Sequence, residues 1–197
     1  VYGLCPTCDH EWGNTTGLPV PQIKYHFSTA LEIGVMLTEY AAYTNRDIEE
    51  YIGFLDGVVK FYDGFYPQND ARGKMIIDPG NALETYHPVR NPIDAVSGLH
   101  ALLERMLALP ERYSLPEQRA NWQRILGRVP PITTRTKAGQ TIIAYAESTS
   151  ERHNVEIPEL YTVFPFGQYG IGQPDLQVAV ATARLAAEDE AQLSHIS

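Results

Sequence analysis

The sequence has little cysteine, and its cysteines do not form a recognisable metal-binding pattern. Only two occur among 197 residues, Cys5 and Cys8, in the order Cys-Pro-Thr-Cys. A structural zinc site needs four ligands, usually supplied by two such pairs at a suitable spacing, and no second pair is present. We therefore expect an ordinary loop at this position, no metal site and no cofactor.

Positive charge is scarce as well. Lys and Arg number 15 against 24 Asp and Glu, which gives a formal net charge of −9 at pH 7. A nucleic-acid-binding protein needs a basic face, and an acidic chain is poorly suited to anionic membranes, so we expect neither partner. No apolar run approaches the roughly 18 residues of a membrane-spanning helix.

No export signal is visible at the start of the chain, where a basic segment would precede an apolar one. The chain opens on Val1 rather than Met, so we expect it to be a piece of a longer protein. The remainder of that longer chain is then its first partner. A secreted or periplasmic location is predicted if the longer chain carries a signal peptide.

Several common catalytic motifs are also missing. The sequence contains no Gly-x-Ser-x-Gly elbow and no phosphate-binding loop. The glycines at 167, 170 and 172 lack the strand-turn-helix setting of a dinucleotide site.

Apolar residues make up 44% of the chain, which is ample for a packed core.

Apolar residues recur at three- and four-residue spacing through most of the chain, which predicts a mainly α-helical fold. The expected helices cover residues 23–44, 48–66, 93–109, 116–129 and 175–187, with one or two helical turns at 157–164. Short turns between helices indicate antiparallel pairs, so we expect about six helices in three hairpins. Short β segments are predicted at 74–77 and, as a hairpin, at 133–136 and 141–145.

Composition divides the chain into three parts. Residues 1–22 are rich in proline and glycine and show no sustained period, which predicts an irregular loop segment. The helical domain follows over residues 23–187. Residues 188–197 form a charged end.

The segment from Asp78 to Pro92 combines functional side chains with residues that restrict the backbone. Its three prolines fix their own φ angles and restrict the residues before them, which predicts an ordered loop. Ordered polar loops on rigid scaffolds commonly carry binding and catalytic groups. We expect Asn91 to cap the helix that follows, with Pro92 in its first turn. The functional side chains of this loop are those of Asn81, Glu84, Tyr86, His87, Arg90 and Asn91.

Carboxylates decide the expected reaction class. A second polar loop carries Glu151, Glu156 and Glu159, and if the two loops meet at one end of the helices, Glu84 faces one of these groups. Hydrolysis of a glycosidic bond needs an acid to protonate the leaving oxygen and a base to activate water, about 6.5–9.5 Å apart when the configuration inverts. An alternative of equal weight is that Glu84 caps a helix or pairs with Arg90.

Other side chains are suited to binding a sugar. Aromatic rings offer stacking faces, although a place in the core is their commoner use. Glu32, in the apolar first helix, is either at a site or an ordinary surface residue paired with Lys24. The expected substrate-binding residues are Trp12, His26, Tyr86, His87, Asn91, His153, Glu159 and Tyr161.

Three blocks of the chain, at 25–67, 76–110 and 154–176, occur in an order that resembles the C-terminal half of six-hairpin glycosidase domains. The likeness is closest to a bacterial branch of uncharacterised domains related to the family 95 α-L-fucosidases. It implies an (α/α)₆ toroid, two concentric rings of helices with the active site at the end formed by the inner-helix loops. Twelve helices of ~10–20 residues need about twice this length, so the resemblance implies about half of a toroid.

The resemblance also suggests catalytic residues. The segment Ala-Leu-Glu-Thr at 82–85 takes the place of the Ser-Pro-Glu-Asn block that carries the general acid, so Glu84 is the expected acid. The later histidine block of the fucosidases is replaced here by 154–160, where Glu156 and Glu159 stand at two histidine positions. Glu156 is then the first choice for the base, and Glu151 the second.

Taken together, the sequence predicts a glycoside hydrolase that cleaves a poly- or oligosaccharide by acid/base catalysis with inversion. The sugar is not specified. The alternative is a non-catalytic helical domain that binds carbohydrate or serves as a scaffold.

Overall fold

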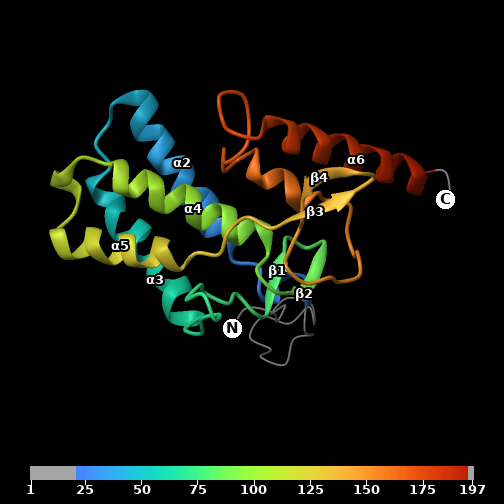
Figure 1. Cartoon of the computed structure of the whole chain (residues 1–197). Helices are drawn as coiled ribbons and strands as arrows, with labels where there is room; N and C mark the ends of the chain where they lie inside the picture. Colours follow the sequence, from blue (N-terminus) through green and yellow to red (C-terminus); the bar gives the residue numbers. More distant parts are fainter. Residues whose placement is uncertain (1–20, 195–197) are drawn as a thin grey trace, which may run out of the picture.

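A computed structural model describes residues 21–194. The protein is about half helical and has two small antiparallel sheets, so the mainly α prediction is confirmed at that level (Figure 1). The helices are α1 (Pro21–Lys24), α2 (Ser28–Thr44), α3 (Ile52–Phe65), α4 (Ile93–Ala108), α5 (Pro116–Arg128) and α6 (Leu176–Ser194), with short 3₁₀ helices at Glu49–Tyr51, Glu111–Tyr113 and Pro158–Thr162. The strands are β1 (Gly80–Ala82), β2 (Tyr86–Val89), β3 (Thr134–Lys137) and β4 (Gln140–Ile143).

The first long helix begins later than predicted. The chain leaves α1 at Lys24 and starts α2 only at Ser28, so the expected continuous helix from residue 23 is wrong. The linking residues include Phe27, whose ring packs edge-on against Phe61 and Phe65 of α3 at centroid distances of 5.0 and 5.3 Å. This contact between distant segments positions the residue that precedes α2, and helical periodicity in the sequence does not show it.

Helices α2 and α4 pack closely and run in the same direction. A Cβ atom built on Gly98 would lie 2.9 Å from the Cβ of Leu31, and one on Gly34 would lie 2.9 Å from the Cδ2 of Leu102. From the first contact to the second the residue number increases on both helices, which shows that α2 and α4 are parallel. The N-terminal ends of α2 and α4 therefore lie side by side.

Helices α3 and α5 complete two antiparallel pairs, α2 with α3 and α4 with α5, around one apolar core. Trp122 of α5 is fully buried and donates its indole N–H to Asp56 of α3 at 2.8 Å. Lys60 pairs with the same carboxylate at 2.6 Å. A buried carboxylate is tolerated when it is paired in this way.

The loop from Asp78 to Pro92 is more regular than predicted. It forms the β1–β2 hairpin, whereas residues 74–77, expected as a strand, contribute only an isolated bridge between Asn69 and Met75. Leu83 and Asn91 both have φ near 50°. Leu83 lies in the short turn between the two strands, where the chain reverses.

Asn91 does not cap α4, and that expectation was wrong. Pro92 occupies the cap position without a side-chain hydrogen bond. The Asn91 side chain instead accepts a hydrogen bond from Ile77 N at 2.8 Å and donates one to Glu147. The amide thus ties the start of α4 to two neighbouring segments.

The third expected helical hairpin has a different composition. The β3–β4 hairpin forms as predicted, with Thr134 opposite Ile143, and α6 packs on β4 and on the 3₁₀ helix η3 (Pro158–Thr162) rather than on a long helix. Ile143 N donates to the Thr182 hydroxyl of α6 at 3.0 Å. Figure 1 shows α6 and β3–β4 on the opposite side of α4 from α3 and α5.

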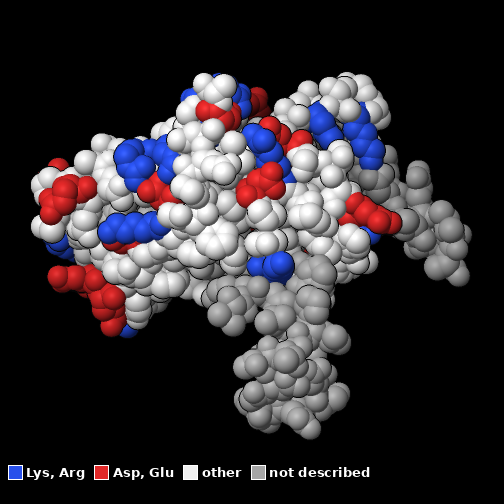
Figure 2. Space-filling view, turned by 90° about the horizontal axis from the view of Figure 1, so that it is seen from below, with Lys and Arg blue, Asp and Glu red and all other residues white. Residues whose placement is uncertain are grey.

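No helix among the described residues is long and apolar enough to cross a membrane. Acidic and basic side chains alternate over the face shown in Figure 2, and neither sign forms a continuous field there.

Candidate functional site

The two polar loops meet near the N-terminal ends of α2 and α4. Tyr86 of β2 forms an antiparallel bridge with Arg152. His153 N donates to Thr85 O at 2.8 Å, and the Ser150 hydroxyl donates to His87 O at 3.1 Å. These contacts hold residues 150–153 along β2, so the two polar loops lie side by side.

Glu84 and Glu156 are each held by the opposite loop. Glu156 Oε2 accepts from Glu84 N and from the Thr85 hydroxyl, both at 3.4 Å. Asn154 donates its amide to Glu84 Oε2, also at 3.4 Å. Arg90 pairs with Glu147 at 3.4 Å, so the structure favours neither the expected Glu84–Arg90 pair nor a capping role for Glu84.

Three further ionisable groups lie beside this pair, at the joined ends of α2 and α4. They are Glu32, Asp94 and His26. We call these three, together with Glu156 of the pair, the carboxylate cluster. Asp94 is only 1% exposed. Neither of its oxygens accepts a hydrogen bond of normal geometry from a described residue, and His26 Nε2 is likewise buried without a partner.

Electrostatic interactions connect the members of the cluster. Burial raises the pKa of Asp94, an effect opposed by His26 and, to a smaller extent, by the Ser28 hydroxyl and nearby backbone groups. Burial also raises the pKa of Glu32, to which the charges of Asp94 and Glu156 add while that of His26 subtracts. Because the charge of Asp94 adds to the pKa of Glu32, these two carboxyl groups do not take up protons independently.

Tyr161 of η3 is the aromatic neighbour of the cluster. The pKa of its hydroxyl is raised by burial and then by Glu32, Glu156 and Asp94. A phenol close to three carboxylates can donate a hydrogen bond to a charged oxygen or to a sugar hydroxyl. Its predicted place at the site is consistent with this position.

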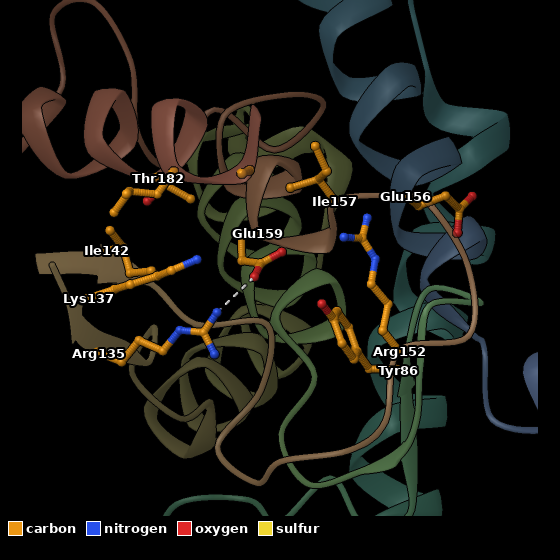
Figure 3. Close-up of a pocket in the computed structure, with 11 residues that line it drawn as sticks. Tyr86, Arg135, Lys137, Ile142, Arg152, Glu156, Ile157, Glu159 and Thr182 are labelled. Carbon is orange, nitrogen blue, oxygen red and sulfur yellow. Dashed lines mark ion pairs between the residues drawn. The ribbon is translucent and has the colours of Figure 1, made fainter. Parts of the chain in front are cut away.

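A cavity of about 40 Å³, lined by Glu156 among others, lies between β2, β3 and η3 (Figure 3). Glu159 is buried there and pairs with Arg135 at 3.5 Å. Burial raises the pKa of Glu159, while Arg135, Arg152 and Lys137 oppose the rise. Glu159 therefore lies among cationic side chains, in a cavity that Glu156 also lines.

The remaining predicted residues have mixed positions. The ring of Tyr86 stacks on Tyr145 at a centroid distance of 3.7 Å, and His87 stacks on His153 at 4.3 Å, so one face of each ring is already occupied. Glu151 is exposed. Trp12, like Cys5 and Cys8, lies outside the described residues.

Asp94 is not among the residues predicted for the site, because an acid in the first turn of a helix usually has a capping or dipole role. Its apolar surroundings, from Ile93 to Leu103, were the available signal. Within residues 21–194, no group of three or more His, Cys, Asp or Glu side chains is arranged to hold a metal ion.

Comparison with known proteins adds no relative to this description. No family model, no curated protein and no solved structure matches the chain.

Proposed function

We propose that this chain is the catalytic part of a glycoside hydrolase, with Glu84 as general acid. The observation that supports the proposal most is the joining of two loops 60 or more residues apart so that Glu84 and Glu156 sit together at the start of α2 and α4. Glu84 is half-buried, as a group that must hold a proton and still reach substrate should be.

The reaction follows from the paired carboxylates. Glu84 protonates the glycosidic oxygen as its bond to the anomeric carbon breaks, and a second carboxylate takes a proton from the attacking water. The sequence favours two bases, and both are exposed, but Glu156 belongs to the carboxylate cluster and Glu151 does not. Donors for sugar hydroxyls come from His87 and His153 on the joined loops and from His26 and Tyr161 beside the cluster.

Half of an (α/α)₆ toroid remains our proposal for the architecture. It is supported by the parallel packing of α2 on α4, each with an antiparallel partner, and by the site at their N-terminal ends. Two apolar grooves support it as well. One of about 590 Å³ lies along α2 and α3 near Ile33 and Phe54, and one of about 650 Å³ lies between η3 and α6 near Phe164. Further helical hairpins of a longer chain would cover both.

The test compares wild type with Glu84→Gln on a panel of aryl glycosides and oligosaccharides. The matched control is Glu39→Gln, which also removes one carboxylate, from a partly exposed pair with Arg105. We expect wild type and the control to turn over at least one panel member and Glu84→Gln to lose about 10²–10⁴-fold. Full turnover by Glu84→Gln refutes the acid assignment, and oligosaccharide binding by a wild type that hydrolyses nothing supports the non-catalytic alternative.

A further inference from the structure

The joined start of α2 and α4 holds an unusual concentration of buried polar atoms without a hydrogen bond of normal geometry. Among the described residues, five of the seven such atoms belong to His26, Ser28, Tyr62 and Asp94. Burying a polar group without a partner is costly, so such groups call for an explanation. The proposed acid, Glu84, and the candidate base, Glu156, form no hydrogen bond with these atoms among the described residues.

The packing of the helices shows which side chains meet there. Leu31 lies level with Gly98 and Gly34 with Leu102, so the level of Asp94 on α4 corresponds to residues 26–28, at the start of α2. Glu32 follows Ser28 by four residues and shares its face of the helix. Side chains on a helix lean toward its N-terminus, which brings the Glu32 carboxyl group back toward Asp94.

Glu32 is the member of this group that reaches the candidate site. It is half-buried, whereas Asp94 is 1% exposed. It forms no hydrogen bond or ion pair with a described residue, yet it interacts electrostatically with Asp94, His26 and Glu156. Its half-buried carboxylate therefore lies at the accessible edge of the cluster, while the Asp94 carboxylate is enclosed behind it.

Glu156 connects the two loops through hydrogen bonds. One of its oxygens accepts hydrogen bonds from Glu84 N and the Thr85 hydroxyl, and its backbone carbonyl also accepts from Thr85, at 3.2 Å. These contacts join the two loops and place Glu84. Glu156 is exposed, but its Oε2 atom is engaged in these loop contacts, whereas the half-buried Glu32 carboxylate has no such contact with a described residue.

We propose that Glu32 is the catalytic base of this site and that Asp94 and His26 are its positioning residues, an inference that rests on the proposed glycoside hydrolysis. A water oxygen bonds to the anomeric carbon while the glycosidic carbon–oxygen bond breaks. The proton of Glu84 passes to the leaving oxygen, and a proton of the water passes to Glu32. Burial and the charge of Asp94 raise the pKa of Glu32, which makes it a stronger proton acceptor once ionised.

The test uses the chain with Glu32→Gln, Glu156→Gln and Asp94→Asn, and Glu39→Gln on the same helix as Glu32 as control. On the glycoside panel we expect Glu32→Gln to lose about 10²–10⁴-fold in turnover. In Glu32→Ala, added formate should restore part of the loss, because a free carboxylate replaces the missing base. A variant inactive through misfolding would not respond to formate, and circular dichroism checks the fold of each.

The role of Asp94 has its own readout. Removing its negative charge lowers the pKa of Glu32, so Asp94→Asn should move the acid limb of the kcat/KM profile to lower pH. A purely structural role would reduce turnover without moving that limb.

Two contrary results are distinguishable. If Glu156→Gln loses turnover and Glu32→Gln keeps it, Glu32 is not the base while the glycosidase proposal stands. If the wild type hydrolyses no panel member, the proposed function fails and the base assignment fails with it.

Discussion

A methyl group added at Gly98 should weaken the packing that brings the two helix ends together. The new Cβ would lie 2.9 Å from Leu31 Cβ and Cδ1 and from Phe166 Cζ, where ordinary contact begins at 3.4 Å. Leu31 Cβ is attached directly to the backbone of α2 and cannot rotate away. The helices must therefore separate by roughly half an ångström, or the core must deform by as much.

The size of the effect follows from two opposing terms. Overpacking of a core costs about 1–3 kcal/mol, while replacing glycine inside a helix gains about 0.5–1 kcal/mol. Gly57, in the middle of α3, provides the matched control because a Cβ there meets nothing within 4 Å. Gly57→Ala should show the helical gain alone, so the two variants should differ by about 1–3 kcal/mol.

Urea and thermal unfolding of both variants measure this difference. At this chain length 1 kcal/mol corresponds to about 2–4 °C in Tm. We expect Gly98→Ala to unfold below Gly57→Ala by either method, with similar dependence on urea concentration. If Gly98→Ala is stabilised as much as Gly57→Ala, the close contact between α2 and α4 is wrong, and so is the site built on it.

Two other predictions concern buried carboxylates. Burial raises the pKa of Asp94 in the folded state. The native protein therefore loses stability as the pH rises from about 4, the pKa of Asp in an unfolded chain, through the folded pKa. Asp94→Asn should raise Tm at neutral pH, with a gain that shrinks toward pH 4, and a gain independent of pH would contradict this. Trp122→Phe removes the 2.8 Å hydrogen bond to Asp56 and should cost about 1–3 kcal/mol in urea unfolding; an unchanged midpoint would show that Lys60 alone satisfies the carboxylate.

Much of the helical framework could be predicted from the sequence because it depends on local periodicity. Helices α4 and α5 and the β3–β4 hairpin begin and end within one or two residues of the expected positions. Their apolar positions, prolines and turn residues all favour the same structure. α6 continues beyond the expected end at residue 187, since nothing in its sequence stops a helix there.

Other features depend on contacts between distant segments, which a local pattern does not contain. The break before α2 follows from the packing of Phe27 on α3, and the β1–β2 hairpin is supported by the bridge from Tyr86 to Arg152. The candidate site shows the same division. The loops that carry Glu84 and Glu156 were identifiable by composition, but the burial of Asp94 beside Glu32 arises only when α2 packs on α4.

The most direct test of the central claim, that Glu84 is a general acid, varies the leaving group. Wild type and Glu84→Gln are compared on aryl glycosides of one sugar whose phenols span a wide range of pKa. A good leaving group needs no proton, so the loss in Glu84→Gln should be small for the most acidic phenol and should grow steadily as the phenol becomes less acidic. An equal loss for every phenol would contradict the account, since Glu84 would then support binding or folding rather than proton transfer.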